Sequence, residues 1–261
     1  MDLGLKGKTA LVMASSQGLG KAIAEGFVKE GVNVLIASRN VDQLKIVKEE
    51  LSSLGDAKVD YIGCDITKPN QIEAMIQKLS TEYGALDVLI NNAGGPPAGS
   101  FEDLTDDEWQ QSFELNLLSY IRIIRGALPL LKRNGGKIIN IASSSIKEPI
   151  SGLILSNTFR TGIVGLSKTL AMELAKYNIL VNTVGPGRIA TDRVKHLDEL
   201  NAKKNGLTIE EIEESEKETI PLGRYGKPEE FANMVVFLAS EANSYVTGSS
   251  FLVDGGKIKS I

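Results

Sequence analysis

The sequence predicts an α/β fold, a single doubly wound domain built on one parallel sheet. Short runs rich in Val, Ile and Leu alternate with amphipathic helical segments along the whole chain, and in this arrangement helices cover both faces of the sheet. The chain has 261 residues without a linker or an internal repeat, and this length is sufficient for one core. We therefore expect one domain over residues 1–261.

Seven strands are expected in chain order. Their apolar runs are nearly continuous rather than alternating, which is typical of strands that are buried on both faces. They lie at residues 9–14, 32–37, 58–63, 88–91, 137–142, 180–184 and 251–253. A seven-stranded parallel sheet follows.

The first strand ends in a glycine-containing turn, after which Lys21 continues a helix. The second strand then closes a βαβ unit. In such a unit the free N–H groups of the helix N-terminus converge on one point, where the aligned peptide dipoles favour a phosphate. Gly18 and Gly20 let a ligand approach the backbone. The turn is therefore a candidate nucleotide site, and the alternative is a tight turn without a ligand.

Two long helices are expected in the middle of the chain. The first spans residues 106–133, opens with a capping box from Thr105 to Glu108, and carries Asn116 on or beside its buried stripe. The residues alone favour structural hydrogen bonding for Asn116, with a site role as the alternative. The second spans residues 156–177, and Ser156 and Arg160 are neighbours on its surface. Taken alone, such a pair is usually solvated.

Composition excludes several classes of function. The chain has 29 Lys and Arg and 33 Asp and Glu, which give a net charge of -4, and charges of one sign form no long block. We therefore expect neither nucleic acid nor a membrane surface as a partner. No apolar segment approaches a membrane span and no signal sequence precedes the first strand, so a cytoplasmic location is expected. The single cysteine, Cys64, should pack in the core, and the lone histidine, His196, makes a metal site improbable.

Motifs in sequence order resemble the short-chain dehydrogenase/reductase family, especially members like 3-oxoacyl-acyl carrier protein reductase. The family's TGxxxGxG turn resembles residues 13–20, its NNAG motif is present at 91–94, and its Pro-Gly and Thr resemble Pro186, Gly187 and Thr191. Residues 228–230, 244–248 and 253–256 match the family's usual ending. The resemblance extends over essentially the whole chain. It implies a Rossmann-type domain, a nicotinamide cofactor and a homotetramer, which the long apolar helices would suit.

The resemblance also implies the cofactor contacts. They are Ala14, Ser15, Ser16, Gln17, Gly18, Leu19, Gly20, Ser38, Arg39, Asn40, Cys64, Asp65, Ile66, Asn92, Ala93, Gly94, Arg160, Pro186, Gly187, Ile189 and Thr191. An NAD-binding member has an acidic residue at the end of the second strand, where this chain has Arg39, a cation that suits the 2′-phosphate of NADP. We expect NADP(H), with NAD as the alternative, since Arg39 could instead stack on the adenine and Gln17 replaces a second basic residue.

The catalytic set of the family is Asn, Ser, Tyr and Lys, and it carries over only in part. Asn116 and Ser143 match the first two, whereas Ser156 and Arg160 stand where the family has YxxxK, and Ala14 replaces the first motif glycine. Serine is a weaker acid than tyrosine, and arginine keeps its proton. Ser143, Ser156 and Arg160 can still stabilise a developing oxyanion while water supplies the proton.

The expected function is hydride transfer between NADP(H) and a small carbonyl or alcohol substrate, such as a 3-oxoacyl compound or a similar ketone. One alternative is conjugate reduction of an enone, since a delocalised enolate needs hydrogen-bond donors more than an immediate proton. This is the reaction of a tyrosine-lacking family member that residues 189–193 and 259–261 resemble. Another is cofactor binding without turnover. Residues 193–220 are expected to form a substrate lid, and His196 or Tyr225 beside it could donate the missing proton.

Overall fold

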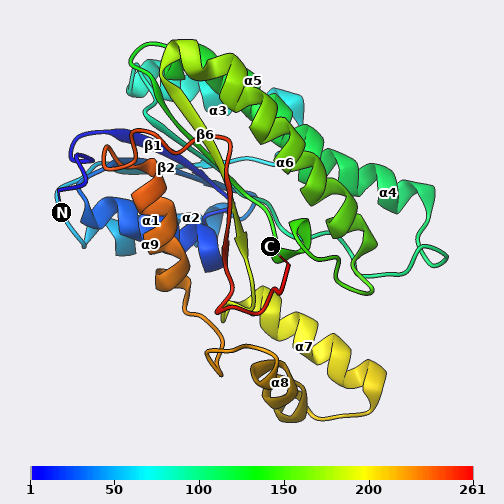
Figure 1. Cartoon of the computed structure of the whole chain (residues 1–261). Coiled ribbons are helices and arrows are strands. Elements are labelled where there is room, and N and C mark those ends of the chain that lie inside the picture. Colours follow the sequence, from blue (N-terminus) through cyan, green and yellow to red (C-terminus); the bar gives the residue numbers. More distant parts are fainter. Residues whose placement is uncertain (1, 261) are drawn as a thin grey trace.

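A computed structural model describes residues 2–260 as one α/β unit around a seven-stranded parallel sheet (Figure 1). The strand order is β3-β2-β1-β4-β5-β6-β7. The strands are β1 (Thr9–Met13), β2 (Asn33–Ser38), β3 (Val59–Gly63), β4 (Val88–Asn91), β5 (Gly136–Ile141), β6 (Ile179–Pro186) and β7 (Ser250–Val253). All seven predicted strands are confirmed, and their ends differ from the predicted ones by at most two residues.

Helices cover both faces of this sheet, as predicted. Alternate residues of β1 point to opposite faces, so that Ala10 and Val12 join one core and Leu11 and Met13 the other. The first core is closed by α1 (Gly18–Lys29), α2 (Val41–Ser52) and α9 (Pro228–Ala239). The second is closed by α3 (Pro69–Glu82), α5 (Ser119–Leu131) and α6 (Ile154–Leu174). Figure 1 shows these two layers on either side of the strands.

The carboxyl edge of the sheet provides the place for a site. The chain leaves β1 for β2 and β3 on one side and returns to β4 on the other, so the loops after β1 and β4 diverge and leave a crevice between them. Beyond the end of β6, α7 (Asp192–Asn205) and α8 (Ile209–Glu218) project as a separate pair of helices (Figure 1). No helix within residues 2–260 is long and apolar enough to cross a membrane.

The predicted helix over residues 106–133 is divided into three parts. Its capping box at Thr105 and Glu108 is confirmed and opens α4 (Asp106–Phe113). A π-helical segment, η1 (Glu114–Leu118), follows and leads into α5. A π turn takes in an extra residue and so rotates the following helix face. Asn116 lies within this segment and is fully buried.

A buried chain of polar side chains fixes α6 on the sheet. The Asn91 amide donates to the Asn140 carbonyl oxygen at 2.8 Å, and the Asn140 amide donates to the Ser167 hydroxyl at 2.8 Å. The Thr183 hydroxyl donates to the same Ser167 oxygen at 2.9 Å. Since these residues belong to β4, β5, α6 and β6, their hydrogen bonds set the position of Arg160 and Ser156, about two and three turns back along α6.

Candidate active site

The glycine turn after β1 is held in a left-handed conformation. Ala14 has φ 48° and Gly18 has φ 56°. A Cβ on Gly20 would lie 2.3 Å from the Ala14 carbonyl oxygen, closer than any real contact. The Ser15 hydroxyl donates to Val12 O at 2.8 Å and accepts from Ala37 N at 3.0 Å, which ties the turn to β2.

No side chain of α1 or its N-cap residue competes with an anion for the free N–H groups at the N-terminus of this helix. Gln17 at the N-cap makes no side-chain capping bond, and the first turn has no acidic residue. The orphan N–H groups of this helix are therefore free to bind an anion. Ser38 reaches the turn by donating from its hydroxyl to the Ser16 hydroxyl at 2.9 Å.

Replacing Ala14 by glycine should stabilise the fold, because a left-handed φ costs a residue with a Cβ about 1–2 kcal/mol. Part of this gain is offset by the larger conformational freedom of glycine in the unfolded chain. We expect Ala14→Gly to raise the free energy of unfolding in urea by up to about 1 kcal/mol. Ala10→Gly, at a buried position in β1 just before the turn, is the control and should lower the free energy of unfolding. Lower stability of Ala14→Gly would mean that the turn is not strained.

A recess lies at the carboxyl ends of β2 and β3. This cavity of about 350 Å³ is lined by Arg39, Val41, Gly63, Cys64, Asp65 and Gln71. Burial and then the charge of Asp65 raise the pKa of the Cys64 thiol to about 11, so the thiol stays protonated. Cys64 is 2% exposed and belongs to the second core, as the sequence predicted. Burial of Asp65 is outweighed by hydrogen bonds from Thr67 and by the charge of Arg39, which lower the pKa of its carboxyl.

A buried guanidinium lies where β4, β5 and α6 meet. Arg160 is 4% exposed, and its Nη1 donates to Ile141 O at 2.8 Å and to the Tyr120 hydroxyl at 3.1 Å. Its Nη2 donates to Ala93 O at 3.1 Å. The Tyr120 hydroxyl in turn donates to Ile141 O at 2.8 Å. Ser156 is 8% exposed one turn earlier on α6, so the pair is buried rather than solvated.

Asn116 and Ser143 border the same region. The Asn116 amide nitrogen donates to Gly94 O at 2.7 Å, and its Oδ1 is buried without a partner among residues 2–260. Ser143 follows β5 and accepts from Ser145 N at 3.2 Å with its hydroxyl oxygen. The short helix η2 (Ser144–Ile146) packs against α6. Arg160 and Asn116 therefore bond neighbouring carbonyls of one loop, next to Ser143 and Ser156.

Two further predicted residues, Asn92 and Thr191, lie at the glycine turn. Asn92 donates from its amide to Ala14 O at 3.5 Å. A Cβ on Gly18 would lie 3.7 Å from Thr191 Cγ2, so the segment after β6 covers the turn. Thr191 also caps α7 by accepting from Val194 N at 3.4 Å. The motifs around Gly18, Asn92 and Thr191 thus meet at one place.

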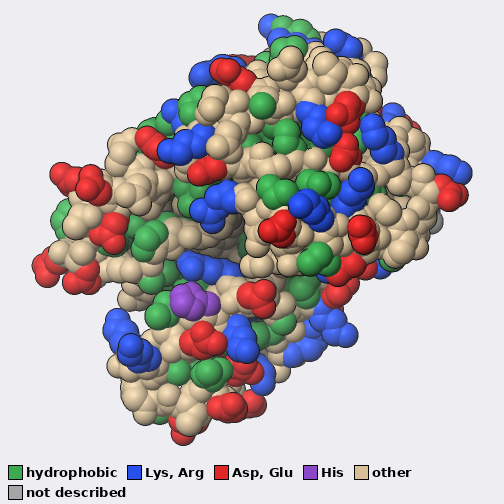
Figure 2. Space-filling model, turned by 180° about the vertical axis from the view of Figure 1, so that it is seen from behind, with side chains coloured by type: hydrophobic (Ala, Val, Ile, Leu, Met, Phe, Trp, Pro, Cys, Tyr) green, Lys and Arg blue, Asp and Glu red, His purple; other side chains and the backbone are tan. Residues whose placement is uncertain are grey.

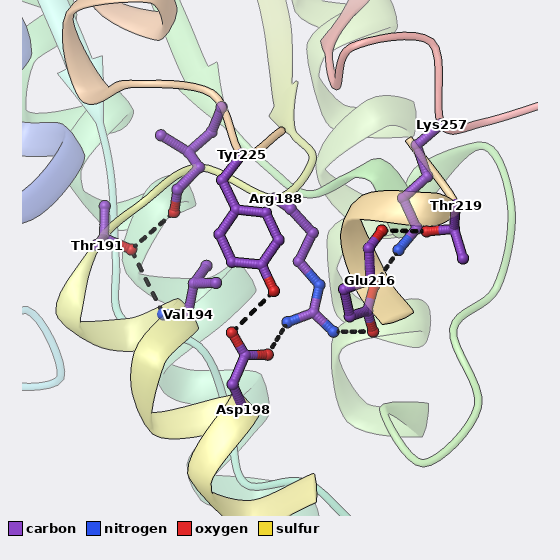
Figure 3. Close-up of polar contacts among 9 residues, drawn as sticks. Arg188, Thr191, Val194, Asp198, Glu216, Thr219, Tyr225 and Lys257 are labelled. Carbon is purple, nitrogen blue, oxygen red and sulfur yellow. Dashed lines mark hydrogen bonds and ion pairs between the residues drawn. The ribbon is translucent and has the colours of Figure 1, made fainter. Parts of the chain in front are cut away.

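The α7–α8 pair is fastened by a polar network that the sequence did not reveal (Figure 3). Arg188 donates to Asp198 at 2.6 Å and also bonds Glu216, which accepts from Lys257. The Tyr225 hydroxyl donates to Asp198 at 3.0 Å. Burial and this hydrogen bond raise the pKa of Tyr225, so it is a poor proton donor for a substrate.

His196, the other donor considered above, lies exposed on α7 with Nδ1 3.6 Å from Glu199 Oε2. Beside the network, a cavity of about 290 Å³ is lined by residues of α7, α8 and the flanking loops, with Thr191, Asp198 and Tyr225 among them. No group of three or more His, Cys, Asp or Glu within residues 2–260 could hold a metal ion.

Comparisons with known proteins agree over the whole chain. Residues 13–257 match the family model described as enoyl-(acyl carrier protein) reductase. The NADPH-dependent reductase BacG of Bacillus subtilis is 37% identical over 97% of this chain and 99% of its own. The 3-oxoacyl-[acyl-carrier-protein] reductase FabG of Aquifex aeolicus is 34% identical over 98% and 99%.

Among solved structures, L-sorbose reductase from Gluconobacter frateurii, complexed with NADPH and L-sorbose, superposes with a TM-score of 0.95 at 35% identity and covers 100% of both chains. Since the family model and these relatives cover nearly the full length, the chain belongs to the short-chain dehydrogenase/reductase family.

Proposed function

We propose that the chain is an NADPH-dependent oxidoreductase that transfers hydride to the carbonyl of a small molecule, such as a 3-oxoacyl compound or a similar ketone. The observation that carries this proposal is the buried Arg160 guanidinium, which meets Ala93 O and Ile141 O with the Ser156 hydroxyl one turn away. A fixed cation beside hydroxyl donors stabilises negative charge that develops on a substrate oxygen. The names of BacG and of the sorbose reductase complex support NADPH.

The residues present fit this cofactor. A Cβ on Gly20 would overlap the backbone of Ala14 and Ser15, so glycine keeps the turn tight beside α1, whose first N–H groups have no side-chain cap. Residues 14–20 would hold the diphosphate, residues 64–66 the adenine, and Ser38, Arg39 and Asn40 the 2′-phosphate. Residues 92–94, Pro186, Gly187, Ile189 and Thr191 would border the nicotinamide half. When bound, the cofactor supplies the hydride.

The SxxxR pair replaces the tyrosine and lysine of the family in this proposal. Ser143 and Ser156 donate hydrogen bonds to the substrate oxygen, and Arg160 contributes positive charge and holds the nicotinamide ribose, since its Nε has no partner among residues 2–260. The unpaired Oδ1 of Asn116 anchors a water, which delivers the proton.

Arg39→Asp should reverse the cofactor preference. The substitution replaces the cation at the end of β2 with the acidic residue that suits a ribose 2′-hydroxyl. Loss of a charge-assisted pair with phosphate corresponds to roughly a tenfold to hundredfold weaker NADPH affinity, while NADH affinity should stay or rise. Fluorescence titration of the wild type and variant with both nucleotides gives the ratio. An unchanged ratio would assign Arg39 to adenine stacking instead.

Two finer features belong to the same proposal. Residues 193–220 form a lid over the substrate, fastened through Arg188 and Glu216.

Homotetramer formation uses the half-exposed aromatic side chains of α4 and α6. The ring centroids of Trp109 and Phe113 lie 5.8 and 6.0 Å from that of Phe159. Light scattering at micromolar concentration tests the assembly, and a monomer would contradict it.

The function is tested by following NADPH oxidation at its near-ultraviolet absorbance with matched ketones and enones, and by identifying the products by NMR. We expect consumption of NADPH and alcohol products. Saturated ketones as products would establish conjugate reduction, the second candidate, which the site favours because no tyrosine stands at position 156. If the protein binds NADPH tightly but oxidises it with none of these compounds, its function is cofactor binding without turnover.

A further inference from the structure

Three side chains from separate elements donate to a single loop after β4. Arg160 of α6 bonds Ala93 O at 3.1 Å, and Asn116 of η1 bonds Gly94 O at 2.7 Å. Arg193 of α7 bonds Pro96 O at 2.9 Å. Arg193 also lies against Gly95, where a Cβ would be 2.9 Å from its Nη2. The loop therefore joins the proposed catalytic residues to the first turn of the lid.

Neither of the two arginines that bond this loop has an acidic partner among residues 2–260. No carboxylate of residues 2–260 lies within 4.0 Å of either guanidinium, although other arginines of the chain, such as Arg188 and Arg224, form ion pairs. Arg160 is nine-tenths buried and bonds only neutral oxygens. Partial burial, and then the charge of Arg160, lower the pKa of Arg193. Two uncompensated cations near each other are costly in a folded protein.

The proposed cofactor does not supply the missing negative charge. Its phosphates belong at the glycine turn and at Arg39, and the nicotinamide ring is neutral when reduced and positive when oxidised. The negative charge that develops on the substrate's carbonyl oxygen would compensate the charge of Arg160 but not that of Arg193. Arg193 is exposed at the first turn of α7, so a solute can reach it. Figure 2 shows Lys and Arg side chains beside a hollow near the histidine, which is His196 of the same helix.

We propose that the substrate is an oxo acid whose carboxylate binds Arg193. This inference rests on the proposed function and names the substrate class of the same site. Ala93 and Pro96 are three residues apart, so their carbonyls are separated by at most roughly 10 Å. This upper limit allows the carbonyl and the carboxylate of one small molecule to reach the two arginines together. Hydride adds to the carbonyl carbon, water protonates the oxygen, and the product is the hydroxy acid.

The test uses three oxo acids of increasing separation, phenylpyruvate, acetoacetate and levulinate, each with its methyl ester. The wild type, Arg193→Met, Arg193→Lys and Arg125→Met are compared, because Arg125→Met removes an exposed cation from α5, outside the proposed lid. NADPH affinity, kcat and KM are measured for each. Binding of the acids to the NADP⁺ complex is measured by calorimetry, which does not depend on turnover.

For at least one acid, kcat/KM should exceed that of its ester at least tenfold. Arg193→Met should reduce kcat/KM for that acid by roughly 10- to 100-fold, mainly through KM. The ester kinetics and NADPH affinity should stay unchanged, and Arg193→Lys should recover part of the loss. Arg125→Met should behave as the wild type.

Three results would overturn the carboxylate site. The first is an equal loss of kcat/KM for the acid and its ester in Arg193→Met. The second is weakened NADPH binding in that variant, which would assign Arg193 to the cofactor. The third is the absence of acid binding to the wild-type NADP⁺ complex. Failure of the proposed function is distinct, because it appears as absence of NADPH binding, or as acid binding that depends on Arg193 without any turnover.

Discussion

Gly20→Ala should abolish productive NADPH binding. The new Cβ would lie 2.3 Å from Ala14 O, 2.8 Å from Ala14 C and 2.9 Å from Ser15 Cα. All three are backbone atoms, so no side-chain rotation relieves the overlap, and the turn must open away from the N-terminus of α1. We expect the NADPH dissociation constant to rise at least about 100-fold, which corresponds to a strain of a few kcal/mol. Fluorescence titration measures it.

Gly165→Ala is the matched control for this variant. Gly165 lies within α6, and a Cβ there would contact nothing within 4 Å. Alanine in a helix interior is favoured over glycine by about 0.5–1 kcal/mol, so this variant should be at least as stable as the wild type and bind NADPH equally well. Circular dichroism of Gly20→Ala separates local loss of binding from unfolding. NADPH affinity at the wild-type level would mean that the turn does not hold the diphosphate.

Installing the family's acid should create a faster ketone reductase. Ser156 and Arg160 are both buried and lie one turn apart on α6, so Ser156→Tyr with Arg160→Lys places a phenol and an amine on the same helix face. A positioned general acid contributes about 10²- to 10⁴-fold in rate. We expect the double variant to gain ketone reduction within this range, measured as kcat for NADPH oxidation.

The single variants show whether the pair acts together. Ser156→Tyr alone should gain less than the double variant, since Arg160 bonds Tyr120 and Ile141 rather than a phenol at position 156. Wild-type turnover of 3-oxoacyl substrates with kcat of about 1–10³ per second, together with an unchanged rate in Ser156→Ala, would contradict these roles and require another acid.

Much of the fold was predictable because its signals are local. Strand positions follow from continuous apolar runs, and the turn from Gly18 and Gly20. The π-helical segment was not predictable, since one extra residue in a turn leaves the apolar spacing around Asn116 nearly unchanged. The left-handed φ of Ala14 was also hidden, because alanine rarely adopts it.

The candidate site was predictable only where a motif carried it. Arg193 and Pro96 are 97 residues apart, and Tyr225 and Asp198 are 27 apart, so no periodicity or spacing connects them. Tyr120 is buried as an apolar residue of its helix would be, but its hydroxyl accepts a hydrogen bond from Arg160.

The central claim is that no side chain titrating near neutrality supplies the proton, and the pH dependence of kcat/KM tests it most directly. Burial raises the pKa of Tyr120 above its usual value, despite the opposing charge of Arg160, and Arg160 keeps its charge. Both groups therefore hold one protonation state between pH 6 and 9. For the compound that the wild type reduces best, kcat/KM should vary less than about threefold over this range. A tenfold fall per pH unit above an apparent pKa within it would contradict the account and identify a side-chain acid.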